Sequence, residues 1–311
     1  MRTSIAIAVL GLWAPLLQAQ MPSDVQAKMA VIGSAPGTQT MQATAQVYMQ
    51  EARKTDRSGV TPTRDLQYGP DRLQTLDLYT PQGKSGVPVV LFVHGGGYTG
   101  GDKNANPTLF SNVPIWFGRQ GVLGATMNYR LAPAAPWPAG AQDVALAVEW
   151  LKKNVQSYGG DPVRIFLFGY SAGGTHVASY ALDRSLQPSS GSGIAGAVLL
   201  SGQYQVMPQG VKELVWNVAA YFGEDRSQHD ARSPITHVGE TNVPLLVARA
   251  EFDLPGITRT TTDLHAVLCK QPERCPRLVV LKHHNHFSTV AAFNTVDEEM
   301  GRAVLSFMGI K

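Results

Sequence analysis

A serine between two glycines lies where a predicted strand meets a predicted helix, in residues 169–173, Gly-Tyr-Ser-Ala-Gly. The apolar run 165–168 before it is typical of a strand, and small, helix-compatible residues follow it. In a strand–turn–helix setting, this G-x-S-x-G pattern presents the serine hydroxyl at a sharp turn, where flanking β-carbons would not fit. The N-terminus of the following helix favours negative charge that develops near the hydroxyl. A glycine-rich turn with an incidental serine has the same pattern, so Ser171 needs partners elsewhere in the chain.

A serine hydroxyl becomes a good nucleophile when a base takes its proton and a third group orients that base. Asp253 follows the predicted strand 243–250, and His286 follows the predicted strand 277–281. The carboxyl ends of parallel strands meet at one edge of a sheet, and the order serine, acid, histidine suits a G-x-S-x-G hydrolase. We therefore predict that Ser171, Asp253 and His286 form a catalytic triad.

Other residues could take the same roles. Glu251 and Asp263 are alternatives for the acid, and the histidines at positions 176, 283 and 284 are alternatives for the base. We prefer His286 because the last helix is predicted to begin directly after it, which leaves the imidazole in the loop. The spacing of the histidines at 283, 284 and 286 could also suggest a metal, but no carboxylates lie at a suitable spacing. We predict no metal site.

A second glycine-rich loop follows the predicted strand 87–93 and reads His-Gly-Gly-Gly at residues 94–97. Ester or amide cleavage needs backbone N–H groups that are fixed before negative charge forms on the carbonyl oxygen. Glycines allow such N–H groups to approach closely, and the N–H of Ala172 is a further predicted donor. The alternative is a flexible glycine loop. We expect His94 to brace this loop rather than to take part in chemistry.

The elements that must position these residues alternate between strands and helices, which predicts an α/β fold with a mostly parallel sheet and helices on both faces. With 311 residues, of which 44% are hydrophobic, the chain suits one sizeable domain. The predicted strands are 63–68, 74–79, 87–93, 122–127, 165–168, 194–200, 243–250 and 277–281. The predicted helices are 38–53, 140–154, the segment after Ser171, 211–222, 258–268 and 289–307.

Two segments interrupt or precede the alternation, residues 22–58 and 203–237, and we expect both to contribute to a small cap. Aromatic side chains are candidates to line a substrate cleft, although each is also typical of core or cap packing. These candidates are Tyr98, Trp137, Tyr170, Trp216 and Tyr221.

Residues 1–19 read as a signal peptide, with a basic start at Arg2, a short apolar core and a small-residue cleavage point after Ala19. The apolar run is too short for a comfortable membrane span, and a retained N-terminal anchor is the alternative. We therefore expect a secreted or periplasmic protein without stable membrane insertion, whose mature chain, residues 20–311, is one domain.

The two cysteines, Cys269 and Cys275, lie six positions apart. In an exported protein this pair predicts a disulfide that closes a short loop, with two free thiols as the alternative. The net charge is only +3 and the Lys and Arg residues form no cluster in the sequence, so a nucleic-acid partner is not expected.

Three motifs together resemble the hormone-sensitive-lipase-like carboxylesterases of the α/β-hydrolase fold: His-Gly-Gly-Gly at 94–97, Tyr-Arg-Leu-Ala-Pro at 129–133 and Gly-Tyr-Ser-Ala-Gly at 169–173. The resemblance covers residues 76–311. It implies an oxyanion hole formed by Gly96, Gly97 and Ala172, and the same triad as above. Two departures are Ala134, where the family has an acidic residue, and Asp-Leu-Pro at 253–255 in place of Asp-Pro-Leu.

These observations predict a serine carboxylesterase that hydrolyses short-chain or aromatic esters of small molecules through an acyl-enzyme, without a metal or organic cofactor. One alternative is an amidase or formamidase that uses the same triad. Another, implied by the resemblance, is a feruloyl or acetyl esterase acting on polysaccharide-derived esters. A third is a non-catalytic binding protein on a hydrolase fold.

Overall fold

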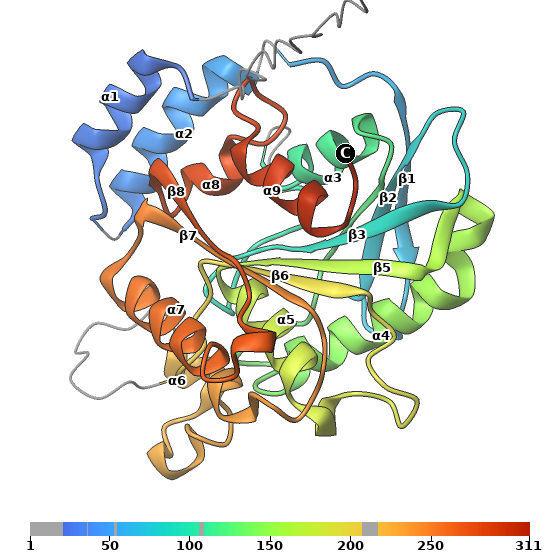
Figure 1. The fold of residues 1–311 in the computed structure, drawn as a ribbon, viewed down its shortest axis with the longest axis vertical. Coiled ribbons are helices and arrows are strands. Elements are labelled where there is room, and N and C mark those ends of the chain that lie inside the picture. Colours follow the sequence, from blue (N-terminus) through green and yellow to red (C-terminus); the bar gives the residue numbers. More distant parts are fainter. Residues whose placement is uncertain (1–20, 36, 53–54, 106–108, 207–216) are drawn as a thin grey trace, which may run out of the picture.

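An eight-stranded sheet runs through the molecule, with helices on both of its faces (Figure 1). The computed structural model describes residues 21–311 except 36, 53–54, 106–108 and 207–216, so the predicted signal peptide lies outside the described residues. In spatial order the strands are β1 (Val60–Gln67), β2 (Thr75–Pro81), β4 (Leu123–Met127), β3 (Val87–Val93), β5 (Gly160–Tyr170), β6 (Gly196–Leu200), β7 (Leu245–Phe252) and β8 (Leu278–Asn285). The pairs β1–β2 and β2–β4 are antiparallel, and the other five pairings are parallel. The predicted α/β fold with a mostly parallel sheet is confirmed.

The helices connect these strands and flank them at both ends of the chain. The α-helices are α1 (Ser23–Ile32), α2 (Thr38–Ala52), α3 (Asn112–Arg119), α4 (Ala139–Asn154), α5 (Ala172–Leu182), α6 (Val218–Phe222), α7 (Pro255–Leu268), α8 (Ser288–Ala291) and α9 (Glu299–Phe307). Short 3-10 helices are η1 (Val155–Tyr158), η2 (Arg184–Leu186), η3 (Arg226–Gln228), η4 (Pro234–His237) and η5 (Pro272–Arg274).

Strand β3 shows why the sequences of the central strands are continuous apolar runs. Side chains alternate between the two faces of a strand, and here both faces are covered by helices. Val89, Leu91 and Val93 pack in one core with residues of α4, α5 and α7. Val90 and Phe92 pack in the other core with residues of α3, α8 and α9. The central strands, whose carboxyl ends carry the site, are therefore packed between two separate hydrophobic cores, one on each face of the sheet.

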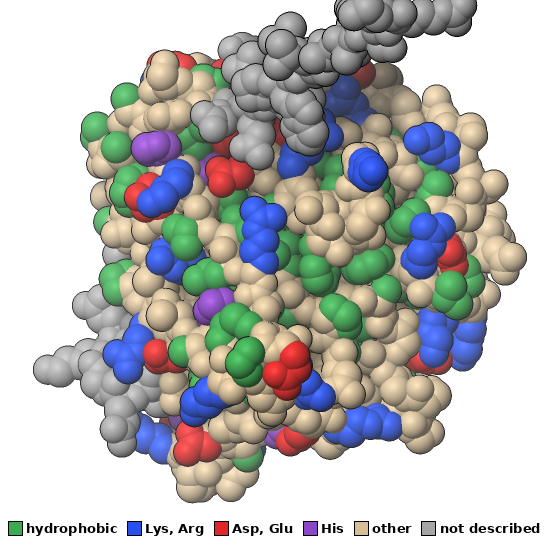
Figure 2. All heavy atoms as spheres, viewed as in Figure 1, with side chains coloured by type: hydrophobic (Ala, Val, Ile, Leu, Met, Phe, Trp, Pro, Cys, Tyr) green, Lys and Arg blue, Asp and Glu red, His purple; other side chains and the backbone are tan. Residues whose placement is uncertain are grey.

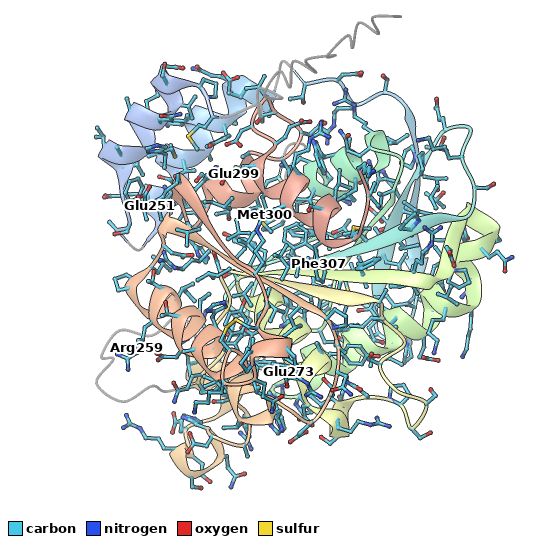
Figure 3. All side chains as sticks on the ribbon, viewed as in Figure 1. Glu251, Arg259, Glu273, Glu299, Met300 and Phe307 are labelled. Carbon is cyan, nitrogen blue, oxygen red and sulfur yellow. A yellow bond between two sulfur atoms is a disulfide. The ribbon has the colours of Figure 1, made fainter. Side chains whose placement is uncertain are left out.

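The predicted helix 289–307 is wrong, because the structure has two helices there, α8 and α9. Asn294, between them, has a φ of 60°, a left-handed conformation that ends a helix and that asparagine tolerates better than most residues. A carboxylate oxygen of Asp297 then accepts a hydrogen bond of 3.3 Å from the N–H of Glu299 as α9 begins. At the other end of α9, Phe307 lies over the sheet (Figure 3), where its ring meets Phe166 edge to face at 6.0 Å.

The N-terminal helices α1 and α2 lie side by side at the β8 side of the sheet, beside α8 (Figure 1). The helix predicted over 38–53 corresponds to α2, whereas α1 was not predicted. Its buried residues Val25 and Met29 lie four positions apart and pack with Tyr48 of α2 and Ala292, just after α8. The two helices thus share one small core with the C-terminal part of the chain.

The surface carries charges of both signs. On the face shown in Figure 2, Lys and Arg side chains are interspersed with Asp and Glu side chains, in keeping with the small net charge of +3. Among the described residues, no helix combines the length and apolar character that a membrane span needs.

Candidate active site

Ser171 sits at a strained turn between β5 and α5, with φ 55° and ψ −122°. A non-glycine residue in such a conformation costs about 1–3 kcal/mol and persists because the surrounding structure holds it. The flanking glycines explain why the chain can turn here. A Cβ on Gly169 would lie 2.5 Å from the carbonyl oxygen of Gly173, and one on Gly173 would lie 2.1 Å from that of Val93. Larger residues at either position would push α5 away from the sheet.

The structure brings the three predicted triad residues together. Oγ of Ser171 lies 3.0 Å from Nε2 of His286, and Nδ1 of His286 lies 2.8 Å from Oδ1 of Asp253. All three residues are buried. An ionised carboxylate can only accept, so Nδ1 donates its proton to Asp253 and Nε2 is left to accept from the serine hydroxyl. This arrangement can move a proton from Ser171 to His286 as the serine attacks.

Asp253 is held by three further donors. Its Oδ2 accepts from the hydroxyl of Ser201 at 2.5 Å and from the N–H of Ala250 at 3.2 Å, and its Oδ1 accepts from the N–H of Leu254 at 2.9 Å. Ser201 was not predicted as a site residue. The available signal was its position: it is a polar residue directly after the strand β6, on the edge where the other site residues lie.

The alternative acids lie in other surroundings. Glu251 accepts from the N–H of His283 at 2.8 Å and from Nζ of Lys282 at 3.2 Å, and the backbone hydrogen bond from His283 lowers the pKa of its carboxyl group. Asp263 pairs with Arg259 at 2.6 Å, one turn away along α7. Asp253 is therefore the acid that faces His286.

The alternative histidines have other partners too. His284 is buried, with Nε2 3.0 Å from Asp297 and Nδ1 3.0 Å from the hydroxyl of Ser288. His176 is enclosed by the rings of Tyr98, Tyr129 and Tyr221. Burial and then the nearby His94 lower the pKa of His176 to about 3, so it remains neutral.

The loop after β3 approaches Ser171 closely, since a Cβ on Gly95 would lie 2.9 Å from Cβ of Ser171. Gly96 has a φ of 141°, Gly97 has a φ of 58°, and a Cβ on Gly96 would lie 2.0 Å from the carbonyl oxygen of Gly100. Glycine is thus required at position 96. Ala172 is the first residue of α5, and the first N–H groups of a helix have no partner within the helix.

His94 supports this loop through ring stacking and a hydrogen-bond contact. Its ring stacks on Tyr129 at 4.5 Å and on Phe110 at 5.6 Å, and Nδ1 lies 2.7 Å from the carbonyl oxygen of Gly95. Burial lowers the pKa of His94, although the hydrogen bond to Gly95 opposes that effect. The loop has a further support, because the side-chain amide of Asn217 donates to the carbonyl oxygen of Gly97 at 3.3 Å.

A cavity of about 440 Å³ opens above Ser171 and His286, and its wall is almost entirely apolar. Its lining comes from the helix α2, from the loop after β3, from the region of Phe110 and from α8. The lining residues that carry side-chain bulk are Met41, Thr44, Ala45, Tyr48, Met49, Leu109, Phe110, Tyr170, Phe287 and Val290.

The cavity corrects several predictions. Tyr170 lines it, but Tyr98 and Trp137 do not. Tyr98 is buried in an aromatic cluster instead, stacked on Tyr221 at 4.8 Å and held by a contact of 3.0 Å between its hydroxyl and that of Thr175. The ring of Trp137 lies beneath Arg232 at 5.3 Å. Trp216 lies outside the described residues.

The structure describes the predicted cap segment 203–237 only in part, so its contribution to a cap stays a prediction. None of the described residues of this segment lines the cavity. They pack beside it instead: Tyr221 and Phe222 of α6 form an aromatic core with Tyr98. Half of the predicted helix 211–222, residues 211–216, lies outside the described residues, and α6 covers its end.

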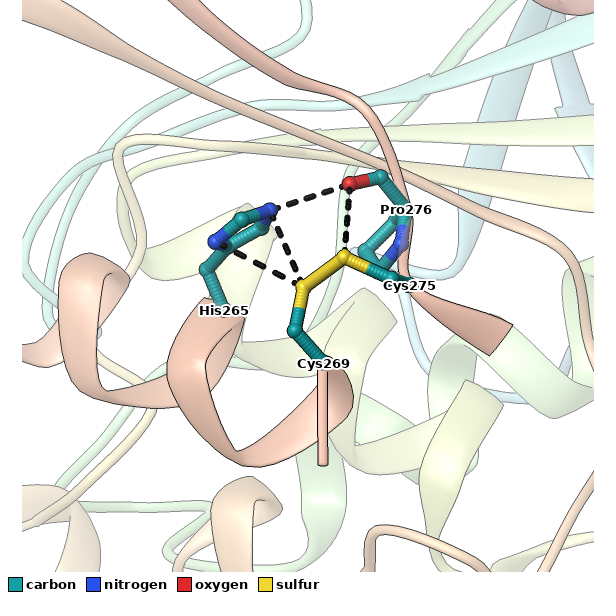
Figure 4. The surroundings of a disulfide bond; sticks show 4 residues. All are labelled: His265, Cys269, Cys275 and Pro276. Atoms are coloured by element: carbon teal, nitrogen blue, oxygen red, sulfur yellow. Dashed lines mark hydrogen bonds between the residues drawn. A yellow bond between two sulfur atoms is a disulfide. The ribbon is translucent and has the colours of Figure 1, made fainter. Parts of the chain in front are cut away.

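Two groups of side chains among the described residues have donor atoms close enough to share a metal ion, and neither includes the histidines of β8 and its following loop. In one group, the predicted pair Cys269 and Cys275 forms a disulfide beside His265 (Figure 4), so the sulfurs are not thiolates. In the other, Nδ1 of His237 lies 2.9 Å from Glu240 and Nε2 lies 2.9 Å from the carbonyl oxygen of Ala231. Both ring nitrogens of His237 are therefore already engaged.

The sheet, the strained serine and the Ser-His-Asp contacts define a protein of the α/β-hydrolase fold. A solved structure agrees: esterase B from Lactobacillus Rhamnosis aligns with a TM-score of 0.70 at 20% identity, over 93% of this chain and 97% of that chain. At this identity the likeness speaks for the fold alone.

Sequence comparison shows which proteins this chain resembles. Residues 76–187 match the family model described as BD-FAE. Human bile salt-activated lipase is 34% identical over 141 residues, 39% of this chain and 18% of that protein. Esterase LipQ of Mycobacterium tuberculosis is 29% identical over 269 residues, 80% of this chain and 62% of that protein. The chain thus spans less than two thirds of the length of these relatives. These comparisons agree with the predicted resemblance to the hormone-sensitive-lipase-like carboxylesterases, since the relatives named are a lipase and an esterase.

Proposed function

We propose that this protein is a serine carboxylesterase that hydrolyses small apolar esters through an acyl-enzyme. The observation that carries the proposal is the continuous contact from Ser171 through His286 to Asp253, at 3.0 and 2.8 Å, at the floor of an apolar cavity. A nucleophile, a base and an orienting acid within hydrogen-bond reach are what acyl transfer requires.

The steps follow from this geometry. Nε2 of His286 takes the Ser171 proton as Oγ bonds to the ester carbonyl carbon, and Asp253 stabilises the imidazolium that forms. The carbonyl oxygen, now negative, accepts hydrogen bonds from the N–H groups of Gly96, Gly97 and Ala172. When the tetrahedral intermediate collapses, the alcohol oxygen leaves and takes the proton from His286. Water then attacks the acyl-enzyme with His286 as its base, which returns the serine and releases the acid.

The cavity indicates the kind of ester. Among the described residues, its side-chain walls are mainly aliphatic, aromatic and thioether groups with the hydroxyls of Thr38 and Thr44, and no Asp, Glu, Lys or Arg side chain contributes to them. Burial of an apolar acyl or alcohol group against such a wall is favourable by about 25 cal/mol per Å² of apolar surface removed from water. A charged group placed there would lose its hydration without compensation. We therefore favour short-chain or aromatic neutral esters over bulky polysaccharide-linked ones, since α2 lies across one side of the cavity.

Hydrolysis of an amide or formamide by the same triad is a second candidate. His286 would then protonate an amine leaving group, and the same cavity would accept the apolar part of the substrate. Matched ester and amide substrates, such as a p-nitrophenyl ester and the corresponding p-nitroanilide, separate the two, because the esterase proposal expects much faster turnover of the ester.

The decisive experiment is Ser171→Ala. We expect the purified wild-type protein to hydrolyse p-nitrophenyl acetate and butyrate, and the variant to lose this activity while it keeps its circular dichroism spectrum and melting temperature. An organophosphate should label the wild type at Ser171 and leave the variant unlabelled. Turnover retained by the folded variant would refute the proposal.

We also propose that the protein acts after export, because residues 1–19 have the pattern of a signal peptide and because disulfides such as Cys269–Cys275 persist in oxidising compartments. Cell fractionation with N-terminal sequencing of the mature chain tests this proposal. A chain found intact in the cytosol would contradict it.

A further inference from the structure

The contacts between the helix α2 and the loop that carries His286 include a buried pair of polar side chains. Nδ2 of Asn285 donates a hydrogen bond of 2.9 Å to Oγ1 of Thr44. Thr44 is fully buried and Asn285 is 1% exposed, so water does not compete for this contact. The two residues are 241 positions apart in the chain, and Asn285 directly precedes the catalytic His286.

The orientation of the contact follows from the other partners of the two side chains. Oδ1 of Asn285 accepts from the N–H of Phe287 at 3.1 Å and from the N–H of Ser288 at 3.0 Å, so its NH₂ group must face Thr44. The hydroxyl proton of Thr44 goes to the carbonyl oxygen of Thr40 at 2.8 Å, so its oxygen is left to accept. Every donor and acceptor of the contact is therefore assigned without ambiguity.

Asn285 fixes the backbone on both sides of His286. Its side chain caps the start of α8, and its N–H donates to the hydroxyl of Ser288 at 2.9 Å. The body of the protein holds the carbonyl oxygen of His286 itself, through Tyr170 at 3.1 Å and Thr289 at 2.8 Å. The contact with Thr44 adds a support from α2 to these supports from the body.

Thr44 has a second role in the same place, because it also lines the substrate cavity together with Ser171 and His286. A group bound in the cavity therefore lies against the turn of α2 that carries this hydroxyl. Buried hydrogen bonds between polar side chains fix geometry, and small displacements of a catalytic group are costly to the rate.

We propose that Thr44 is a positioning residue for His286, acting through Asn285, so that α2 belongs to the catalytic centre as well as to the wall of the cavity. This inference rests on the proposed esterase function. A positioning role has a consequence that a wall role alone does not have, because loss of the Thr44 hydroxyl then lowers turnover of every ester, whatever the length of its acyl group.

The test compares Thr44→Val, which keeps the shape and removes the acceptor, with Thr44→Ser, which keeps the hydroxyl. Thr40→Val is the matched control, since it makes the same exchange one turn earlier on α2, outside the cavity lining. We expect Thr44→Val to lower kcat about tenfold for p-nitrophenyl acetate and hexanoate alike, with KM changed less than about twofold. Thr44→Ser, which keeps the acceptor, should recover most of the kcat that Thr44→Val loses, and Thr40→Val should retain wild-type kcat.

A double-mutant cycle with Asn285→Ala tests whether Thr44 acts on His286 through Asn285. If Thr44 acts through Asn285, Thr44→Val should lower kcat no further in the Asn285→Ala background. If the fold-losses of kcat in the two single variants multiply in the double variant, Thr44 does not act through Asn285 and the inference is overturned. An unchanged kcat in Thr44→Val, with KM raised for hexanoate alone, would reduce Thr44 to a wall residue and overturn the inference.

Two further measurements keep these outcomes distinct from misfolding and from a wrong function. Titration with an organophosphate counts competent active sites, so kcat is expressed per folded site, and Thr44→Ala removes the hydroxyl without adding a buried methyl group. If the wild type hydrolyses no ester, or if Ser171→Ala remains active, the proposed function fails. If the wild type depends on Ser171 while Thr44→Val and Thr44→Ala match it in kcat, the further inference alone fails.

Discussion

The hydroxyl of Ser201 donates a hydrogen bond of 2.5 Å to Oδ2 of Asp253, the carboxylate oxygen that does not bond to His286. Ser201 follows β6 as Ser171 follows β5, and both serines have positive φ values, of 52° and 55°. Two neighbouring parallel strands are thus each followed by a serine with a positive φ. One turn presents the proposed nucleophile, and the other holds the proposed acid.

Ser201→Ala should therefore slow the reaction without removing any triad residue. Loss of a hydrogen bond to a charged group costs about 1.5–3 kcal/mol, and we expect kcat to fall by about tenfold or more. Ser201→Gly is the control: it loses the same hydroxyl but tolerates the positive φ, so it should match Ser201→Ala in kcat and melt at a higher temperature. Steady-state kinetics and thermal melts check both points. Wild-type kcat in the two variants would show that Ser201 does not support Asp253.

The glycine at position 96 offers a test of the oxyanion hole. A Cβ there would collide with the carbonyl oxygen of Gly100, so Gly96→Ala must displace the loop. Loss of one oxyanion donor costs about 10²–10³ in kcat, and we expect a loss of that size for p-nitrophenyl butyrate. Gly83→Ala is a suitable control, since Gly83 also has a positive φ but a Cβ there meets no atom within 4 Å. Equal kcat values for the two variants would contradict the proposed role of the loop.

The cavity should set the preference for acyl length. Ala45 lines the cavity from α2, and Ala45→Phe places a ring where a longer acyl chain would lie. We expect kcat/KM for hexanoate or benzoate esters to fall at least tenfold, because each displaced methylene is worth about 1–3 kcal/mol, while acetate is hydrolysed as before. Gln46→Phe adds the same ring one position along, at an exposed residue outside the cavity lining, and should leave the preference unchanged. A uniform effect of Ala45→Phe on all chain lengths would argue against this use of the cavity.

His237 should make stability depend on pH. Burial lowers the pKa of His237, but hydrogen bonds to Ala231 and Glu240 and the nearby Asp183 outweigh burial and raise the pKa above its usual 6.5. Because this pKa is raised in the folded state, protonated His237 adds to the free energy of unfolding. This contribution is complete below about pH 6.5 and is lost as the pH rises through the folded pKa. Wild type should thus be more stable than His237→Gln at pH 6, by a margin that shrinks toward pH 9. Urea unfolding at both pH values measures the margin, and a constant margin would contradict the expectation.

The disulfide Cys269–Cys275 should contribute to stability and not to catalysis. It links the end of α7 to the chain just before β8 (Figure 4), whereas His286 follows the other end of that strand. Closing a loop of this length stabilises a fold by on the order of 2 kcal/mol through chain entropy. The double variant Cys269→Ser and Cys275→Ser should melt earlier and retain kcat, and reduced wild type serves as its control. Equal melting temperatures would show that the bond contributes little.

Local sequence was enough to predict the parts of the site that depend on neighbouring residues. The glycines at 169 and 173 are needed by the turn that carries Ser171, and the apolar runs of β3 and β5 reflect burial on both faces of the sheet. Strand order along the chain then placed Asp253 and His286 on the same edge, because parallel strands end together. The break between α8 and α9 was missed, since it depends on the backbone of one residue, Asn294.

The sequence by itself therefore determined the fold class and the three residues that meet at the strand ends. Only the tertiary structure decided which other groups surround them. It placed α2 against the cavity, Thr44 against Asn285 and Ser201 against Asp253, and it turned Tyr98 away into the aromatic core. The physical reason is distance along the chain: a turn is encoded by adjacent residues, but the docking of a helix depends on the complementary shapes of two surfaces, which no local pattern specifies.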